Sequence, residues 1–145
     1  MPKLKPLNYF YMTDSIFTKI INRELPGHFV YEDEHCVAIL DRFPAVPGQL
    51  VVIPRVQIDY VFDLDDTTYT HLFQVAKQLG AACDAALGAA RTCLVVEGLD
   101  VPHVHIKIYP LPTTDTPLGA IMPTGVEATD EALALIATQI QASLT

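Results

Sequence analysis

The chain has 145 residues, half of them hydrophobic, and a formal net charge of -8 at pH 7. This composition excludes an intrinsically disordered chain, and the lack of a long apolar run excludes a membrane protein. The negative charge excludes a general nucleic-acid binder, which would need a basic stripe. We therefore expect one soluble domain spanning residues 1–145, long enough to bury a core.

Cysteine usage and the N-terminus bear on the compartment. Cys36, Cys83 and Cys93 are odd in number and lie in apolar segments. Free buried thiols suit them better than a disulfide framework, and such thiols are typical of a reducing cytoplasm. Lys3 and Lys5 stand near the start, but prolines and polar residues interrupt any apolar run there, so no signal peptide is predicted. These features predict a cytoplasmic location.

The first predicted element is a short helix behind an extended arm. Residues 1–13 hold two prolines and several aromatic residues, which is typical of an arm. Asp14 or Ser15 is placed to cap a helix that runs to about Asn22, because either side chain can accept a backbone N–H at a helix start.

Three apolar runs then predict three strands, at residues 29–31, 36–40 and 50–53. Glu32-Asp33-Glu34 separates the first two and predicts a hairpin turn. The third run is apolar without a break and is ended by Pro54. An unbroken apolar strand is buried on both faces, so we expect something to pack on each side of the sheet.

A long helix is predicted next, from a cap at Asp65 or Asp66 to about Ala90. Apolar residues recur along it at i, i+3, i+4 and i+7 and predict one buried stripe, made of Tyr69, Leu72, Phe73, Ala76, Leu79, Cys83, Ala86 and Leu87. Its second half is rich in alanine, which lets another backbone come close. A subunit interface and a tight contact between helix and sheet both explain this composition.

The last part of the chain predicts a strand, a turn, a strand, a loop and a helix, at residues 93–96, 97–100, 102–110, 110–126 and about 129–143. Five strands with short turns and one long central helix predict an α+β fold on a largely antiparallel sheet. We expect its core at 14–110, followed by a loop and a C-terminal helix at 111–145.

Residues 102–110 alternate polar and apolar residues between two prolines, which is the pattern of a strand with one buried face. Successive side chains on a strand point to opposite sides, so His103, His105 and Lys107 share one face. They stand roughly 7 Å apart, which is twice the rise per strand residue. Two imidazoles and an ammonium in one row predict an anion site with a candidate nucleophile at its centre.

Three interpretations of this row are open. In the first, a neutral imidazole attacks phosphorus, and Lys107 stabilises charge on the phosphoryl oxygens and lowers the pKa of His105. In the second, His103 and His105 are metal ligands, although no third ligand stands in register and Lys107 would repel a divalent cation. In the third, the row is only a polar sheet face. We favour the first interpretation.

This stretch resembles the signature of the histidine triad family, a strand with alternating histidines closed by apolar residues. Further segments resemble the family in the same order: Asp14 to Ile21, Glu24 to Pro26, Tyr31 to Glu34, Cys36 to Asp41 and Pro44 to Arg55. The resemblance covers about residues 14 to 110 and is therefore more specific than any single motif. It implies a histidine-triad-like fold.

The resemblance also implies a homodimer that binds a purine nucleotide or nucleotide conjugate and attacks its α-phosphate. The family's nucleophile falls on His105, and its first histidine falls on His103, which would orient or protonate the leaving group. The ribose-binding carboxylate falls on Asp41. The apolar base pocket falls on Phe17, Ile20 and Ile39. Ordinary core positions would equally explain those three apolar residues, and a turn would explain Asp41.

The sequence departs from the family near the expected phosphate. The third histidine is Lys107, which keeps a phosphate donor but loses an imidazole. The histidine before the third strand is Gln49, which donates a hydrogen bond but exchanges no proton at neutral pH. Leu99 and Asp100 stand where the family has a phosphate-contacting Gln and Ser. Asp100 would repel a phosphate unless it pairs with Lys107 or orients His103.

Zinc-binding members of the family place two cysteines where Ser15 and Thr18 stand, and a histidine where Gln57 stands. Because those ligands are missing here, we predict no structural zinc and no other cofactor.

Together these observations predict a nucleotide hydrolase or transferase. It would cleave a nucleoside monophosphate ester or amide, or a dinucleoside polyphosphate, through a nucleotidyl-His105 intermediate, with Lys107 and Gln49 holding the phosphate. The alternative is a catalytically weak nucleotide-binding or interaction protein on the same fold, because several groups that would raise the rate are replaced.

Overall fold

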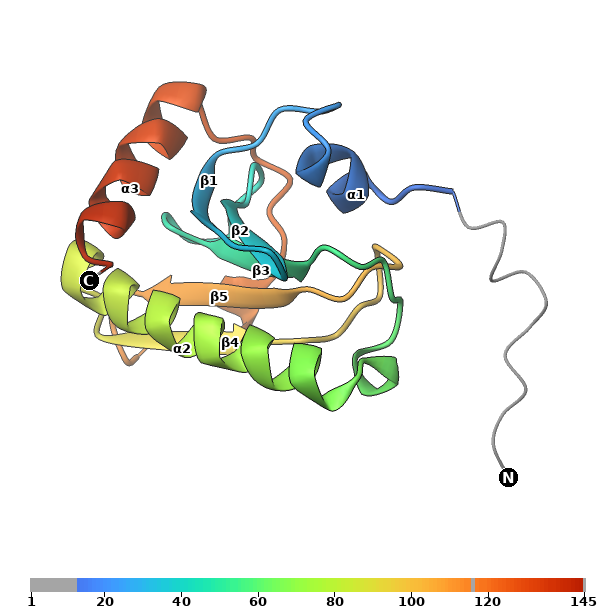
Figure 1. Ribbon diagram of the computed structural model, residues 1–145. Helices are drawn as coiled ribbons and strands as arrows, with labels where there is room; N and C mark the ends of the chain where they lie inside the picture. Colours follow the sequence, from blue (N-terminus) through green and yellow to red (C-terminus); the bar gives the residue numbers. More distant parts are fainter. Residues whose placement is uncertain (1–12, 116, 145) are drawn as a thin grey trace.

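Five antiparallel strands form one sheet in the computed structural model of this protein, which describes residues 13–115 and 117–144. The strands lie in the order β1-β2-β3-β5-β4, and every neighbouring pair is antiparallel (Figure 1). In chain order the elements are α1 (Ile16–Ile21), β1 (Phe29–Glu32), β2 (Cys36–Leu40), β3 (Leu50–Pro54), η2 (Val61–Asp63), α2 (Asp66–Leu87), β4 (Arg91–Val95), β5 (Ile106–Leu111), η3 (Leu118–Ile121) and α3 (Asp130–Ala142). The predicted α+β fold is confirmed. The predicted arm lies, apart from Thr13, outside the described residues.

Helices cover both faces of this sheet. Helix α2 runs along one face, and α3 packs against α2 and β1 (Figure 1). Alternate residues of β2 therefore enter different clusters: Ala38 and Leu40 join the core under α2, whereas Val37 and Ile39 join a cluster with α1. Every residue of β2 and β3 is buried, and for β3 the unbroken apolar run at residues 50–53 predicts this burial. The face that α1 covers carries the candidate site.

Side-chain caps start the three α-helices, and the caps of α1 and α2 are each one of the two residues that the sequence predicts. Ser15, Asp65 and Thr129 each accept a backbone N–H in the first turn of the helix that follows. Helix α2 ends at Leu87, earlier than its predicted end near residue 90. Gly88 has a φ of +63° and ends the helix in the left-handed conformation, which glycine adopts without strain.

Strand β5 starts at Ile106, later than the predicted strand that carries His103. The ladder between β3 and β5 stops at the pair Val52–Ile106, and Pro54, two residues further along β3, has no N–H with which to extend it. The chain before Ile106 still runs alongside the segment after Pro54, held by a hydrogen bond of 2.7 Å from the Val104 N–H to the Ile58 carbonyl. The expected strand is therefore half strand and half extended loop.

The alanine-rich half of α2 packs closely on the sheet. Ala76 and Ala82 are buried, and a methyl group added at Gly80 would lie in van der Waals contact with Thr92 of β4, 3.7 Å away. This packing accounts for Ala76, Gly80 and Ala82, and the subunit interface stays a prediction. The cysteines are free, as predicted, and Cys36 and Cys83 are buried, whereas Cys93, also expected to be buried, is half-buried.

Candidate functional site

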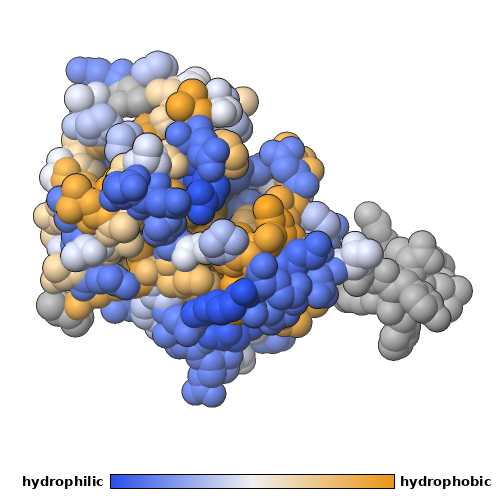
Figure 2. Space-filling view, turned by 90° about the horizontal axis from the view of Figure 1, so that it is seen from above, coloured by the Kyte–Doolittle hydropathy of each residue, from blue (hydrophilic) through white to orange (hydrophobic). Residues whose placement is uncertain are grey.

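A cavity of about 500 Å³ lies between α1, the sheet and the start of α3. Hydrophobic side chains are exposed among hydrophilic ones on the side of the molecule where α1 and α3 lie (Figure 2). Polar and charged residues line the cavity at a few positions: His28, Asp41, Arg42, Gln49, Asp100, His105, Lys107 and Tyr109. A mostly apolar cavity of this size with a few convergent polar groups is typical of a small-molecule site.

His105 lines this cavity and is held as a neutral imidazole. Its Nδ1 lies 2.8 Å from the backbone carbonyl of His103, and because a carbonyl only accepts, Nδ1 must carry the proton. The lone pair of the neutral ring then sits on Nε2. Burial lowers the pKa of His105, and the nearby ammonium of Lys107 lowers it further. The Phe17 ring stands edge-on to the imidazole, 4.8 Å away between centroids, and fixes its orientation.

His103 lies outside the lining of the cavity and is fully buried. Its Nε2 donates to the carbonyl of Pro54 at 2.7 Å, and its Nδ1 accepts from the hydroxyl of Ser15 at 2.7 Å. Burial lowers the pKa of this imidazole and favours its neutral form, in which one ring nitrogen donates a hydrogen bond and the other accepts one. The expectation that His103 protonates a leaving group does not fit this arrangement, because neither nitrogen is turned to the cavity. Its backbone carbonyl, instead, orients His105.

A hydrogen-bonded network ties α1 to His103. The Ser15 hydroxyl also caps α1, and the Thr18 hydroxyl donates to Gln57 Oε1 at 2.7 Å. The Ser15 backbone N–H donates to the same oxygen at 2.8 Å. Ser15, Thr18 and Gln57 are the three positions where the resemblance implies zinc ligands in other family members. In this chain they bond to one another and to His103.

Lys107 lines the cavity on the same side as His105, but its charge is already paired. Its Nζ lies 2.8 Å from a carboxylate oxygen of Glu97, in the turn before β5. Burial alone would lower the pKa of Lys107, but Glu97, together with Tyr109 and Asp100, outweighs burial and raises the pKa. The sequence suggested Asp100 as a partner of Lys107, whereas the structure pairs Lys107 with Glu97. Gly98, with a φ of +63°, makes the turn that brings Glu97 to this position.

Asp41 and Gln49 bond to each other at the cavity wall. Gln49 Nε2 donates to Asp41 Oδ2 at 2.9 Å, and its Oε1 accepts from the Ala45 N–H at 2.6 Å. The other carboxylate oxygen of Asp41 accepts from the Phe43 N–H at 2.8 Å. Asp41 is thus both a turn residue and a cavity residue. Gln49, expected to hold phosphate, is buried and directs its amide to Asp41.

The three predicted base-pocket residues are brought together. Phe17, Ile20 and Ile39 all line the cavity, and all belong to the hydrophobic cluster between α1 and the sheet. Core packing and cavity lining are therefore not alternatives here. The apolar lining also includes Ile16, Leu25, Ile121 and Leu133, which the sequence pattern did not single out as pocket residues. Ile121 lies in the segment predicted as a loop, which contains η3.

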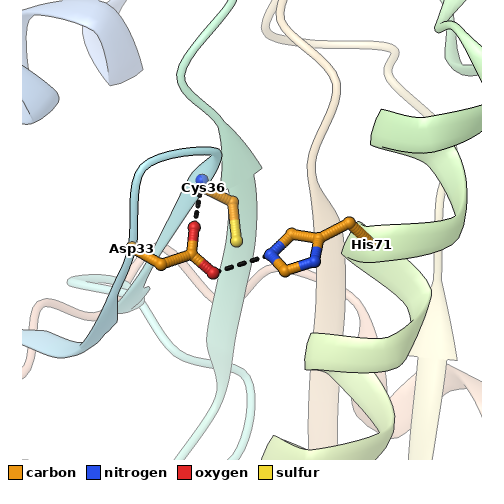
Figure 3. A group of neighbouring side chains, drawn as sticks. All are labelled: Asp33, Cys36 and His71. Carbon is orange, nitrogen blue, oxygen red and sulfur yellow. Dashed lines mark hydrogen bonds and ion pairs between the residues drawn. The ribbon is translucent and has the colours of Figure 1, made fainter.

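A second polar cluster lies at the β1–β2 hairpin (Figure 3). It consists of Asp33 and Cys36 of the hairpin and His71 of helix α2. Their potential ligand atoms lie within 4.8 Å of one another, and among the described residues this is the group that could hold a metal ion. His103 and His105 do not belong to it.

Hydrogen bonds already satisfy this cluster. His71 Nε2 lies 2.6 Å from Asp33 Oδ2, which also accepts from the Tyr31 hydroxyl at 2.8 Å. The backbone N–H groups of His35 and Cys36 donate to the other carboxylate oxygen. Burial alone would raise the pKa of Asp33, but these bonds outweigh it and hold the pKa far below its usual range. The cluster therefore joins the hairpin to α2.

Comparisons with known proteins agree with this architecture. A family model described as "HIT domain" matches residues 22–113. An uncharacterized HIT-like protein of Borreliella burgdorferi is 33% identical over 112 residues, which cover 68% of this chain and 76% of that protein. An uncharacterized HIT-like protein of Methanocaldococcus jannaschii is 34% identical over 100 residues, covering 66% of this chain and 77% of that one.

Solved structures share the fold over nearly the whole chain. A Hit-like protein of Bartonella henselae, described as involved in cell-cycle regulation and crystallised with an unknown ligand, has a TM-score of 0.82 at 26% identity and covers 92% of this chain and 98% of its own. A hypothetical histidine triad nucleotide-binding protein of Sulfolobus tokodaii has a TM-score of 0.79 at 32% identity, covering 88% and 90%. Within the described residues, no helix has the length and apolarity needed to span a membrane.

Proposed function

This chain belongs to the HIT domain family, and from that membership we propose that it is a nucleotide-binding hydrolase that acts through a nucleotidyl-His105 intermediate. One observation carries the proposal. The bond from His105 Nδ1–H to the His103 carbonyl leaves the lone pair on Nε2 of a neutral ring that lines the cavity. A neutral imidazole so oriented is a competent nucleophile near pH 7.

The cavity suggests how a nucleotide would lie. A purine base would pack on the apolar wall of Phe17, Ile20 and Ile39, and Asp41, oriented by Gln49, would accept hydrogen bonds from ribose hydroxyls. The α-phosphate would then face His105. The similar Sulfolobus tokodaii structure is described as a nucleotide-binding protein, and this supports a ligand of the same class.

In the reaction, Nε2 of His105 would attack the α-phosphorus and displace an ester, amide or polyphosphate group. Water would then release the nucleoside monophosphate. Lys107, beside the phosphate, would stabilise its developing charge, although Glu97 shares that ammonium. His103 would hold the tautomer and orientation of His105.

A cytoplasmic homodimer is the proposed working state. Strand β4 is an edge of the sheet, and its Leu94 is a large hydrophobic residue that is 43% exposed. An open edge strand with an exposed apolar side chain is a natural place for a second copy to pair. The other edge, β1, is packed by α3.

A second candidate is a nucleotide-binding module with little turnover. The pairing of Lys107 with Glu97 and the commitment of the Gln49 amide to Asp41 favour it. Both arrangements reduce the donors that a phosphate in the transition state could use.

Hydrolysis of a dinucleoside tetraphosphate and of a nitrophenyl ester of AMP tests the proposal, with product AMP measured by chromatography. The His105→Asn variant should lose turnover while it still binds AMP in calorimetry, because asparagine can keep the bond to the His103 carbonyl. His35→Asn, at an exposed histidine outside the cavity lining, is the matched control. Turnover that persists in His105→Asn rejects the mechanism. AMP binding without turnover in the wild type and in both variants favours the binding module.

A further inference from the structure

We propose that this site acts on substrates whose leaving group departs as a stable anion, such as the anhydrides of dinucleoside polyphosphates, and discriminates against phosphoramidates and alkyl esters. This inference rests on the proposed function and concerns the atom that leaves phosphorus. An oxygen leaving from an anhydride needs no proton, whereas an amine nitrogen or an alkoxide does. Among residues 13–115 and 117–144, the side chains that line the cavity offer no proton donor suited to that task.

His103 is sealed from the leaving group. It is fully buried, and both ring nitrogens bond to the protein, one to the Pro54 carbonyl and one to the Ser15 hydroxyl. To protonate a substrate, the ring would have to break one of these buried bonds and turn through the packed contact with Phe17. A buried polar group that loses its partner costs free energy, so this motion is disfavoured.

Lys107 is the cation beside the nucleophile, and it is a poor acid. Its ammonium is fixed on the Glu97 carboxylate at 2.8 Å, and this partner raises its pKa above the usual lysine value. A general acid works best when its pKa lies near the working pH, so this ammonium stabilises charge but holds its own proton.

The imidazole of His28 and the hydroxyl of Tyr109, which also line the cavity, lie far along the sheet from the nucleophile His105. His28 lies next to β1, three strands away from His105 next to β5, which is roughly 14 Å at the usual strand spacing. It is also bonded to Asp130 at 3.1 Å. Tyr109 stands four residues along from His105, roughly 13 Å at the usual rise per residue, and burial raises its pKa.

The remaining polar groups do not transfer protons at neutral pH. Arg42 keeps its charge, the Gln49 amide is not an acid, and the carboxylates of Asp41 and Asp100 act as acceptors when ionised. Among the described residues that line the cavity, no side chain therefore both reaches the leaving atom and gives up a proton readily.

The step is balanced for an anhydride without any such donor. The Nε2 lone pair of His105 forms the N–P bond, the P–O bond to the leaving phosphate breaks, and its electron pair stays on that oxygen. The ring becomes cationic and keeps its Nδ1 proton on the His103 carbonyl. Water then attacks phosphorus, the N–P bond breaks, and the proton from water passes to solvent. An amide substrate would instead expel a strongly basic nitrogen anion.

A matched set of substrates tests the inference. Each carries adenosine 5′-monophosphate joined to a different leaving group: a second nucleotide through an anhydride, a series of phenols of graded acidity, and a primary amine. Because general acid catalysis contributes about 10²- to 10⁴-fold, we expect kcat/KM for the amidate to fall at least about 100-fold below that for the anhydride. Within the phenol series, kcat/KM should fall steeply as the phenol becomes less acidic.

The outcomes separate the two proposals. An amidate turned over within about tenfold of the anhydride, or a flat phenol series, overturns this inference and leaves the hydrolase proposal standing. Absence of turnover on the whole set, with no AMP attached to His105 by mass spectrometry, rejects the proposed function and this inference with it.

A variant adds a second readout. Lys107→His places an imidazole, a better proton donor near pH 7, beside the leaving group. The ratio of amidate to anhydride turnover should rise about tenfold or more in this variant. Lys77→His, at an exposed lysine of α2 outside the cavity lining, should leave the ratio unchanged. An unchanged ratio in Lys107→His would contradict the inference.

Discussion

The backbone carbonyl of His103 and the Nδ1 of His105 lie 2.8 Å apart, and this one bond fixes the tautomer of the proposed nucleophile. His103 is itself fixed by Pro54 at the end of β3 and by Ser15 at the start of α1. The orientation of the reactive ring thus depends on three segments that meet only in the folded chain. His103 therefore acts as a positioning residue for His105.

The pH dependence of turnover should reflect the neutral state of His105. Burial and Lys107 lower its pKa, while the His103 carbonyl, Glu97 and Asp41 act in the opposite direction. Because the neutral ring is the reactive form, kcat/KM for an anhydride should stay constant as pH falls and decline only below the usual histidine pKa of about 6.5.

Lys107→Met removes one of the two effects that lower the pKa of His105. The acid limb of its pH profile, where kcat/KM declines as pH falls, should therefore move to higher pH. Burial remains, so the limb should stay below that of an exposed histidine. An acid limb above about pH 6.5 in the wild type, or an unmoved limb in Lys107→Met, would contradict this electrostatic account.

Glu97 should oppose phosphate binding. Its carboxylate pairs with Lys107 at 2.8 Å and competes with an incoming phosphate for that ammonium. In Glu97→Gln, AMP should bind more tightly, by about 1 kcal/mol or roughly fivefold, and the binding should depend more steeply on salt. Calorimetry at two salt concentrations measures both effects. Glu34→Gln, on the exposed hairpin turn, is the matched control, and equal affinities in all three proteins would show that Glu97 does not compete.

Sequence patterns predicted the fold and identified several of the residues that line the cavity. Alternation along the last strand placed His105 and Lys107 on one face, and both line the cavity. The unbroken apolar run at residues 50–53 predicted a strand buried on both faces. These features depend on neighbours in the sequence, where periodicity is informative.

The partners of those side chains could not be predicted in the same way. The turn geometry at Gly98 decides that Glu97, rather than Asp100, meets Lys107. His103 looked equivalent to His105 by spacing. Its bonds to Ser15 and Pro54 span 88 and 49 residues and turn it away from the cavity. Contacts over such separations depend on packing that no local pattern encodes.

Ser15 should contribute more to stability than an ordinary helix cap. Its hydroxyl caps α1 and also serves Nδ1 of the buried His103. Ser15→Ala removes a cap worth about 1 kcal/mol and leaves the buried Nδ1 of His103 with only the longer contact of 3.4 Å to the Thr18 hydroxyl, and this loss should cost about 1–3 kcal/mol more. Chemical denaturation measures the free energy of unfolding. Thr129→Ala removes only the cap of α3 and should cost about 1 kcal/mol, so similar losses in the two variants would refute a second role for Ser15.

The hairpin cluster should make the fold sensitive to acid. Hydrogen bonds from Tyr31, His71 and two backbone N–H groups hold the pKa of Asp33 far below that of an unfolded aspartate, despite the opposing effect of burial. A carboxyl group with a lowered folded pKa adds stability above its unfolded pKa of about 4, and this stability is lost as pH falls toward the folded value. Asp33→Asn should therefore destabilise the protein at pH 7, by about 2 kcal/mol for hydrogen bonds to a charged group.

Thermal and urea unfolding from pH 7 to pH 2 should show the stability of the wild type converging on that of Asp33→Asn below about pH 4. Asp63→Asn, at an exposed position in η2, is the control and should track the wild type throughout. A stability difference between wild type and Asp33→Asn that persists unchanged at pH 2 would mean that the carboxylate charge does not hold the hairpin to α2.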